Sequence, residues 1–373
     1  MISTRRSLIS STISSGASKA NSRKWGEILS CFRLSAVETL QGFEKGEEFL
    51  GERRWVSLSL LSRCRQIVFC KVKCTGYIMK EEERSITAEL AAYERARHLL
   101  YDDPILLKDS FAIEFLSPRR RRFLKNPVIG LLMRSTLYRH FRPVRAPSAA
   151  RSHYCEDRLE KTIAQGMTQY VIIGAGYDSF ALRRRDLSDS FRIFELDHPA
   201  TQKAKKERLS ELNVELPKNL EFIPVDFEKE TIAEVLKRSS YIREVPTFFS
   251  CLGTIHFLTR DAIFKTLRSL PSFVAPGSEI IFDYRIPDVL INPKELKRVN
   301  KIRRLTAHYG EPIITLFDPH ILVTEMEDLG LELIENLSPN EQKVRYFANR
   351  KDNLIPSGTT YFAHFRVRRL EGK

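Results

Sequence analysis

Strand-like and helix-like segments alternate from residue 169 to the end of the chain, and this pattern constrains the fold more than any other feature of the sequence. The strand candidates are short apolar runs at 169–173, 192–196, 220–224, 247–251, 279–284, 331–336 and 361–367. The helix candidates between most of them are 201–212, 231–239, 260–270 and 319–329. Such alternation is typical of a parallel sheet covered by helices on both faces. The sequence therefore predicts an α/β fold.

A helical layer is expected before this region. The helix candidates are 85–100, 110–116, 128–138 and 149–165. Ser85 or Thr87 can cap the first of them, and the arginine-rich residues 117–127 are expected to join the second to the third. We predict a helical cap over residues 79–148 and a main domain over residues 149–373.

The first 78 residues differ in composition from the rest. They hold 13 of the 61 Lys and Arg residues but 6 of the 47 acidic residues, so half of the net charge of +14 lies in them. Residues 1–26 are rich in serine and contain basic residues but no acid, as in an organellar transit peptide. Three interpretations stay open: an extension upstream of a natural start at Met79, a transit peptide, or an accessory element. We expect residues 1–78 to be poorly ordered and seek the function after Met79.

The composition is that of a folded globular protein, with 42% hydrophobic and 29% charged residues. No run of 18 apolar residues occurs, so neither a membrane span nor a membrane partner is expected. Cys155 and Cys251 alone give no disulfide framework, which favours a reducing cytoplasm. The other four cysteines lack the CxxC pairs or histidines of a zinc site, so we expect no metal.

The ends of three neighbouring strands indicate a ligand site. Gly174 and Gly176 follow the first strand, where they permit a tight turn and close approach of the backbone to a ligand. Asp197 ends the second strand, where a carboxylate can accept hydrogen bonds from both hydroxyls of a ribose. Asp226 and Phe227 end the third, where they can bind an adenine amino group and pack on its ring. Together these positions predict a nucleoside-containing cofactor.

Several segments, in their order along the chain, point to one family. They are SITAELAAYERARHLLYDDPILLKDSFA (85–112), AARSHYCEDRLEKTI (149–163), QYVIIGAGYDSFALRR (169–184), FELDHPATQKAK (194–205), PVDF (224–227), PTFFSCLGTIHFLT (246–259) and SEIIFDY (278–284). This ordered set resembles the leucine carboxyl methyltransferase-like family of S-adenosylmethionine-dependent methyltransferases, over nearly all of residues 85–368. It looks more similar to the bacterial branch than to the eukaryotic enzymes that methylate the C-terminus of a protein phosphatase.

The resemblance implies a fold and a set of cofactor ligands. The implied fold is a Rossmann-like class I methyltransferase, with a seven-stranded, mostly parallel sheet, helices on both faces and an N-terminal helical cap over the cofactor. S-adenosylmethionine is the implied cofactor, and the residues implied to bind it are Arg151, Gly174, Gly176, Asp197, Asp226 and Phe227. Arg151 would pair with the methionine carboxylate, which suits the fork of a guanidinium group.

One segment departs from the family's pattern. The phosphatase-methylating enzymes have a glutamate after the fourth strand, in a segment like AEC or AEG, whereas this chain has Cys251-Leu252-Gly253. The role of that glutamate cannot be carried over to Leu252. Methylation of a phosphatase is therefore not inherited from the resemblance.

The catalytic residue is unknown from the sequence. A sulfonium cofactor already carries a good leaving group, so methyl transfer requires positioning of a nucleophile and removal of its proton where needed. His256, just after the fourth strand, His153, in the helix before the first, and Tyr284, at the end of the fifth, are weak candidates for the base. Each of them is also consistent with an ordinary packed or solvent-facing side chain.

Three alternatives to a methyltransferase stay open. A nicotinamide-dependent oxidoreductase would share the glycine turn and the acid, but the third glycine position is Ser179. The isoelectric point of about 9.5 and the arginines at 119–122 and 183–185 raise the possibility of nucleic-acid binding. No aromatic and basic RNA-recognition motif accompanies these arginines, which favours a solvated face. A module that binds the cofactor without turnover is the third.

The methyl acceptor is expected to be a small molecule. The helices within 85–138 and the insertion at 287–319 are expected to cover the carboxyl ends of the strands, where ligands of open α/β sheets bind. An enclosed pocket excludes water and suits a compact acceptor with a carboxylate or hydroxyl oxygen, whereas a nucleic acid would need an open basic channel. The oligomeric state is unknown from the sequence.

Overall fold

The computed structural model describes residues 85–134, 146–350, 352 and 354–368. Residues 1–78, for which three interpretations stay open, lie outside the described residues. So do residues 135–145, which hold the end of the helix expected at 128–138. None of the helices in the described ranges has the length and apolarity needed to cross a bilayer.

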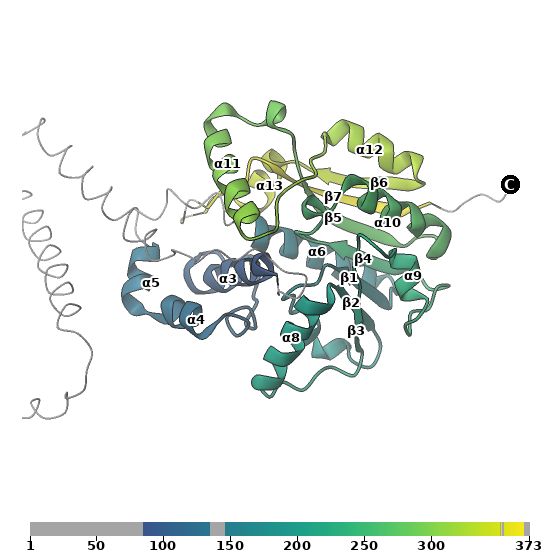
Figure 1. Cartoon of the computed structure of the whole chain (residues 1–373), viewed down its shortest axis with the longest axis horizontal. Helices are drawn as coiled ribbons and strands as arrows, with labels where there is room; N and C mark the ends of the chain where they lie inside the picture. Colours follow the sequence, from purple (N-terminus) through teal and green to yellow (C-terminus); the bar gives the residue numbers. More distant parts are fainter. Residues whose placement is uncertain (1–84, 135–145, 351, 353, 369–373) are drawn as a thin grey trace, which may run out of the picture. The chain divides into compact units, whose positions relative to one another are not determined.

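A sheet of seven strands forms the centre of the described residues, in the order β3-β2-β1-β4-β5-β7-β6 (Figure 1). The strands are β1 (Gln169–Ile173), β2 (Arg192–Asp197), β3 (Leu220–Pro224), β4 (Thr247–Cys251), β5 (Glu279–Arg285), β6 (Leu331–Leu337) and β7 (Thr360–Val367). The pairs among β1 to β5 are parallel, and β7 is antiparallel to both β5 and β6. The predicted Rossmann-like, mostly parallel sheet is thus confirmed, and each strand lies within two residues of its expected position.

Both faces of the sheet are buried, as the unbroken apolar runs of the strands predicted. Val171 and Ile173 of β1 face one core cluster, which also contains residues of α9 (Ile232–Leu236), α10 (Arg260–Phe273) and α12 (Pro319–Asp328). Tyr170 and Ile172 face the other, with residues of α6 (Ala146–Ala164) and α7 (Phe180–Arg183). Because β1 to β5 run parallel, their carboxyl ends meet at one edge of the sheet, and the candidate site lies there.

The helical layer differs in part from the prediction. The helix α3 (Ile86–Tyr101) begins after Ser85, whose hydroxyl accepts a hydrogen bond from the backbone N–H of Ala88. Residues 110–116 form turns rather than the expected helix, whereas the expected linker contains α4 (Pro118–Lys125). The reason is local. Pro118 suits the first helical position, and the carboxylate of Glu114 accepts from Arg121, so the arginine run has an acidic partner.

The other helices complete the layer and the insertion. They are α5 (Pro127–Arg134), α8 (Pro199–Glu211), α11 (Pro293–His308) and α13 (Pro339–Tyr346), together with the short 3₁₀ helices η2 (Arg185–Leu187), η3 (Ile255–Phe257) and η4 (Asp288–Leu290). In the layer, α3 contacts α5 and α6, and α4 contacts α5 (Figure 1). The sequence analysis did not expect α11 or α13.

Candidate cofactor and acceptor site

The turn after β1 requires both of its glycines. Gly174 and Gly176 have φ angles of +68° and +51°, in the left-handed region that favours glycine. A Cβ atom at Gly174 would lie 2.2 Å from the hydroxyl oxygen of Thr254, and one at Gly176 would lie 3.1 Å from the Cβ of Ala88. The turn is therefore packed between the segment after β4 and the start of α3.

Asp197 joins this turn to the end of β2. Its carboxylate accepts hydrogen bonds from the backbone N–H groups of Gly176 and, at 2.6 Å, His198. Burial raises the pKa of Asp197, although these two hydrogen bonds oppose the shift. The N–H of Gly174 donates to the carbonyl of Leu196 at 2.8 Å. The structure thus brings Gly174, Gly176 and Asp197 together, as predicted from their positions at strand ends.

The end of β3 joins the same edge, but its two predicted residues differ in environment. The N–H of Val225 donates to the carbonyl of Asp197 at 2.9 Å. The side chain of Asp226 is 29% exposed and pairs with Lys229 at 2.9 Å, and the hydrogen bond from Lys229 lowers its pKa. Phe227 is buried and belongs to the hydrophobic core under the sheet. Asp226 is thus open to a ligand, whereas the ring of Phe227 packs in the core beside the carboxyl end of β3.

Arg151, from α6, lies at the ends of β4 and β5. Its Nη1 donates to Oδ2 of Asp283 at 3.2 Å, and the side chain of Asp283 is 1% exposed. The other oxygen of Asp283 accepts from the backbone N–H of Gly253 at 2.5 Å. Gly253 has a φ of +72°, and a Cβ there would lie 2.3 Å from Nη2 of Arg151. The guanidinium group therefore rests against the glycine that follows β4.

His256, in η3, is the predicted base whose pKa is affected by the charge of Arg151. Its side chain is buried, and its Nδ1 has no hydrogen-bond partner among the described residues. Burial, together with Arg285 and Arg151, holds the pKa of His256 well below its usual value, so the imidazole is neutral. The Nε of Arg285, at the end of β5, is also buried without a partner in the described part of the chain. An unprotonated imidazole and two guanidinium groups thus gather at this edge.

The other two candidate bases lie elsewhere. His153 is two residues from Arg151 on α6, which places it on a different face of the helix, where its ring meets Tyr346 edge-on at 5.3 Å. Tyr284 follows Asp283 on β5 and therefore points to the opposite face of the sheet, where its hydroxyl donates to Asn336 at 3.0 Å. Burial raises its pKa far above its usual range. The structure brings neither residue to Arg151.

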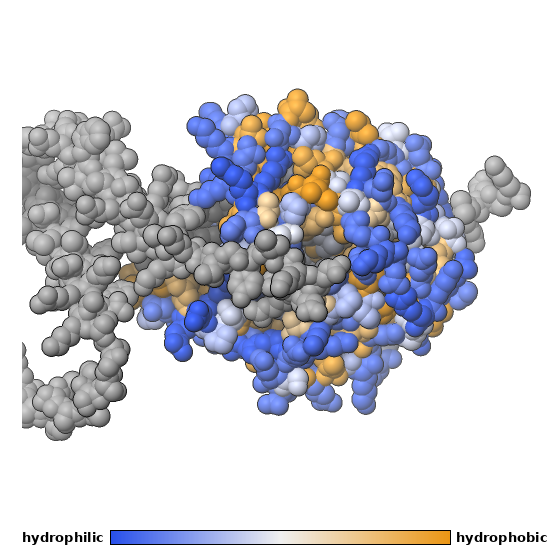
Figure 2. Space-filling model, viewed as in Figure 1, coloured by the Kyte–Doolittle hydropathy of each residue, from blue (hydrophilic) through white to orange (hydrophobic). Residues whose placement is uncertain are grey.

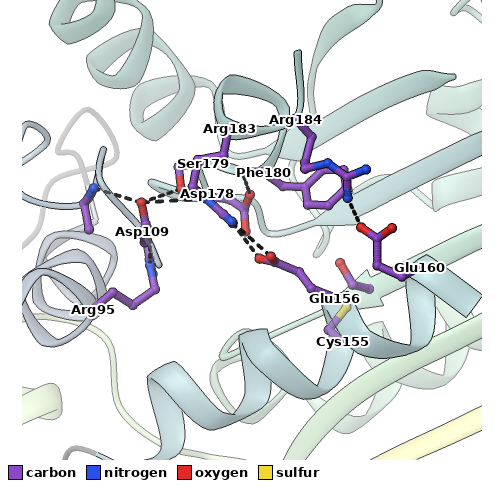
Figure 3. Close-up of polar contacts among 12 residues, drawn as sticks. Arg95, Asp109, Cys155, Glu156, Glu160, Asp178, Ser179, Phe180, Arg183 and Arg184 are labelled. Carbon is purple, nitrogen blue, oxygen red and sulfur yellow. Dashed lines mark hydrogen bonds and ion pairs between the residues drawn. The ribbon is translucent and has the colours of Figure 1, made fainter. Parts of the chain in front are cut away.

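A buried polar network that the sequence analysis missed ties the helical layer to the glycine turn (Figure 3). Asp109 accepts from Nε of Arg95 at 2.7 Å and from the hydroxyl of Ser179 at 2.6 Å. Arg95 also donates to the carbonyl of Tyr177 at 2.6 Å. Arg183 donates to the Ser179 hydroxyl and makes a two-pronged ion pair with Glu156 of α6. No sequence motif marks this network, because its members meet only through the fold.

The insertion after β5 contacts the start of α3, the other segment that was predicted to cover the carboxyl ends of the strands. Glu311 accepts from the hydroxyl of Ser85 at 2.6 Å and from the backbone N–H of Thr87 at 2.9 Å. The N–H of Ile314 donates to the carbonyl of His256 at 3.0 Å. The same insertion therefore contacts both the first turn of α3, next to Gly176, and the segment that carries His256.

Comparison with known proteins identifies related sequences. Residues 88–270 match the family model described as leucine carboxyl methyltransferase. YktD of Bacillus subtilis (strain 168), named as a candidate S-adenosyl-L-methionine-dependent methyltransferase, is 32% identical over 306 residues, which span 77% of this chain and 99% of that protein. A protein of the same description from Mycobacteroides abscessus is 24% identical over 184 residues, 49% of this chain and 58% of that protein.

Among solved structures, a DUF574 family protein from Streptomyces avermitilis is similar, with 16% sequence identity and a TM-score of 0.49. The similarity covers 77% of this chain and 98% of that chain.

Proposed function

We propose that this chain, which belongs to the leucine carboxyl methyltransferase family and is an S-adenosylmethionine-dependent methyltransferase, transfers a methyl group to a small molecule. The atom methylated would be an oxygen of a carboxylate or of a hydroxyl group. One observation carries this proposal. His256, after β4, and Arg285, at the end of β5, each have a buried ring or guanidinium nitrogen without a hydrogen-bond partner among the described residues, and the N–H of Ile314 in the insertion donates to the carbonyl of His256 at 3.0 Å. The charges of Arg285 and Arg151 help to lower the pKa of His256. Such surroundings would stabilise an oxygen nucleophile that is already anionic or that is losing its proton.

The residues at the three strand ends fit the cofactor. The close packing around Gly174 leaves backbone, not side chain, facing the ligand, and the carboxylate of Asp197 suits a ribose. Asp226 would lie at the adenine, Phe227 would support this edge from the core, and Arg151 would pair with the methionine carboxylate. The cofactor supplies a methyl group on a sulfonium leaving group, so the protein needs no general acid.

The chain's own residues would then act on the acceptor. A hydroxyl acceptor would give its proton to Nδ1 of His256, which has no hydrogen-bond partner among the described residues. A carboxylate acceptor is already ionised and would need no base, so its oxygen would depend on Arg285 for charge stabilisation. Enclosure by α3 and the insertion would exclude water from either nucleophile.

The arginine clusters support a small acceptor over a nucleic acid. Arg120 pairs with Glu89, and Arg121 with Glu114. Arg183 pairs with Glu156 in the interior, and Arg184 pairs with both Asp186 and Glu160. Most of these charges are therefore neutralised within the protein.

In Figure 2 hydrophilic residues cover most of the visible surface of the described residues, and apolar ones form separate small groups.

To test this proposal, the full chain is given S-adenosylmethionine with a labelled methyl group, and transfer of the label is measured separately to a small-molecule extract, to protein and to RNA. We expect label in the small-molecule fraction and little loss of activity between 50 and 200 mM salt, whereas a nucleic-acid acceptor would lose activity by orders of magnitude. Label in protein or RNA alone would overturn the proposal. Cofactor binding without transfer to any fraction would favour a non-catalytic module.

The role of His256 is tested separately. His256→Gln should lower kcat with a hydroxyl acceptor by about 10²- to 10⁴-fold, the usual contribution of a general base. His153→Gln is the matched control, because that histidine lies on a different face of α6 and should leave kcat unchanged. Equal rates for wild type and His256→Gln would point to a carboxylate acceptor.

A further inference from the structure

Asp283 is a buried carboxylate that the sequence analysis did not single out. It lies on β5, and its side chain is 1% exposed. A carboxylate removed from water needs a positive charge or hydrogen-bond donors beside it, and the structure provides one of each. Oδ2 accepts from Nη1 of Arg151, and Oδ1 accepts from the N–H of Gly253. One carboxylate therefore fixes a side chain from α6 and the backbone after β4.

Asp283 restricts the positions of both Arg151 and the backbone at Gly253. Arg151 is a long, flexible side chain, and Asp283 is its hydrogen-bond partner among the described residues. Because Asp283 holds one Nη atom, the remaining donors of the fork stay free to meet a second anion. Gly253 has a φ of +72°, and its missing Cβ leaves the space in which Nη2 of Arg151 lies. The position of the guanidinium group is therefore set from two sides.

We propose that Asp283 is a positioning residue that, together with Gly253, holds the guanidinium of Arg151 in place to bind the amino-acid carboxylate of the cofactor. This inference rests on the proposed function, since it takes Arg151 as the ligand of the methionine end. In this proposal Asp283, whose side chain is 1% exposed, has no contact of its own with cofactor or acceptor. Its effect should therefore be confined to ligands that carry the carboxylate.

The experiment compares two ligands by calorimetry on the full chain. S-adenosylhomocysteine has the amino-acid carboxylate, whereas 5′-methylthioadenosine has the same nucleoside and sulfur but lacks it. Asp283→Asn keeps the shape of the side chain and removes its charge. We expect the variant to bind S-adenosylhomocysteine roughly 10- to 100-fold more weakly, as for a lost charged hydrogen-bond partner, and 5′-methylthioadenosine as wild type does.

A matched control lies on the same strand. Glu279, four residues earlier on β5, is buried and pairs with His364 and Arg366, away from Arg151. Glu279→Gln should lower the melting temperature without changing the ratio of the two affinities. A merely structural role of Asp283 would give the same pattern, with both ligands weakened equally or not at all, and would overturn the proposal.

Two further variants separate the possible failures. Gly253→Ala, which would place a Cβ where the guanidinium lies, should reproduce the selective loss even if Asp283→Asn does not fold. Arg151→Ala should also lose the preference for S-adenosylhomocysteine, and adding Asp283→Asn to it should cost no more. If Arg151→Ala loses the preference and both other variants keep it, Asp283 has no positioning role. If wild type binds neither ligand, the proposed cofactor site fails, and this inference fails with it.

Discussion

At the scale of single residues, two buried carboxylates of the site region have pKa values shifted in opposite directions. Burial dominates at Asp197, whose pKa is raised. Burial would also raise the pKa of Asp109, but Arg95 and Arg183 outweigh it and the pKa is lowered. The charge of Asp197 is thus only partly compensated within the protein, which suits a ligand-binding role, whereas that of Asp109 is used to stabilise the fold.

We therefore expect Asp197→Ala to weaken binding of S-adenosylmethionine and S-adenosylhomocysteine by about 1.5–3 kcal/mol, the usual cost of losing a charged hydrogen-bond partner. Calorimetry on the folded variant measures this loss, and Asp186→Ala, at an exposed ion pair with Arg184, is the control. Unchanged affinity would remove Asp197 from the site. Binding of NADH in place of both ligands would favour the oxidoreductase alternative.

Asp109→Ala should lower the free energy of unfolding by about 3–5 kcal/mol, because it leaves Arg95 buried without its partner. The contribution of Asp109 has a defined pH dependence. Since its folded-state pKa is depressed, the stabilisation is present above the unfolded-state pKa of about 4 and is lost as the pH falls through the folded-state value. Urea unfolding of wild type and variant at several pH values measures both effects. A loss below 1 kcal/mol would contradict the expectation.

His256 gives a pH dependence in a higher range. Its pKa is depressed in the folded state, so below about pH 6.5 the unfolded chain binds a proton that the folded protein does not. The stability of wild type should therefore fall as the pH drops from about 6.5 to 5.5, and His256→Gln should show a smaller fall. Identical slopes in denaturant unfolding would show that His256 is not held neutral.

At the scale of elements, α3 depends on the insertion for the position of its first turn. The carboxylate of Glu311 binds Ser85 and Thr87 at the N-terminus of the helix, where a negative charge is also favoured by the helix dipole. Because Ala88 packs against Gly176, this contact bears on the glycine turn.

Glu311→Gln should therefore increase hydrogen exchange of the backbone amides in the first turns of α3, measured by mass spectrometry. Glu325→Gln on α12, which removes an ion pair with Arg260 of α10, is the control and should leave α3 unchanged. Equal protection of α3 in all three proteins would mean that the insertion does not hold the helix.

At the scale of the whole molecule, the described elements all lie within one compact unit, Tyr77–Lys373. We expect a protein that begins at Met79 to have the melting temperature of the full chain and to bind S-adenosylhomocysteine equally well. Scanning calorimetry and titration calorimetry test the two statements. Loss of folding on truncation would show that residues 1–78 belong to the core, and the interpretation as an upstream extension would be wrong.

Local signals predicted the sheet well and the helical layer less well. Each strand is a short apolar run between turn residues, so its position depends on few neighbours. Residues 117–127 were expected to join two helices. In the structure Glu89 and Glu114 pair with Arg120 and Arg121, and a helix forms.

The sequence by itself determined the order of the strands along the chain, the glycine turn and the acid at the end of β2, because these depend on local backbone geometry and on the periodicity of burial. Only the tertiary structure decided which side chains meet. Arg151 and Asp283 are 132 positions apart, and Asp109 and Ser179 are 70 apart. The charge of Arg151 acts on the pKa of His256, whereas the ring of His153, two residues from Arg151, packs against Tyr346. Distance along the chain carries no information about such contacts, since helix phase, strand pleat and sheet order together set the direction of each side chain.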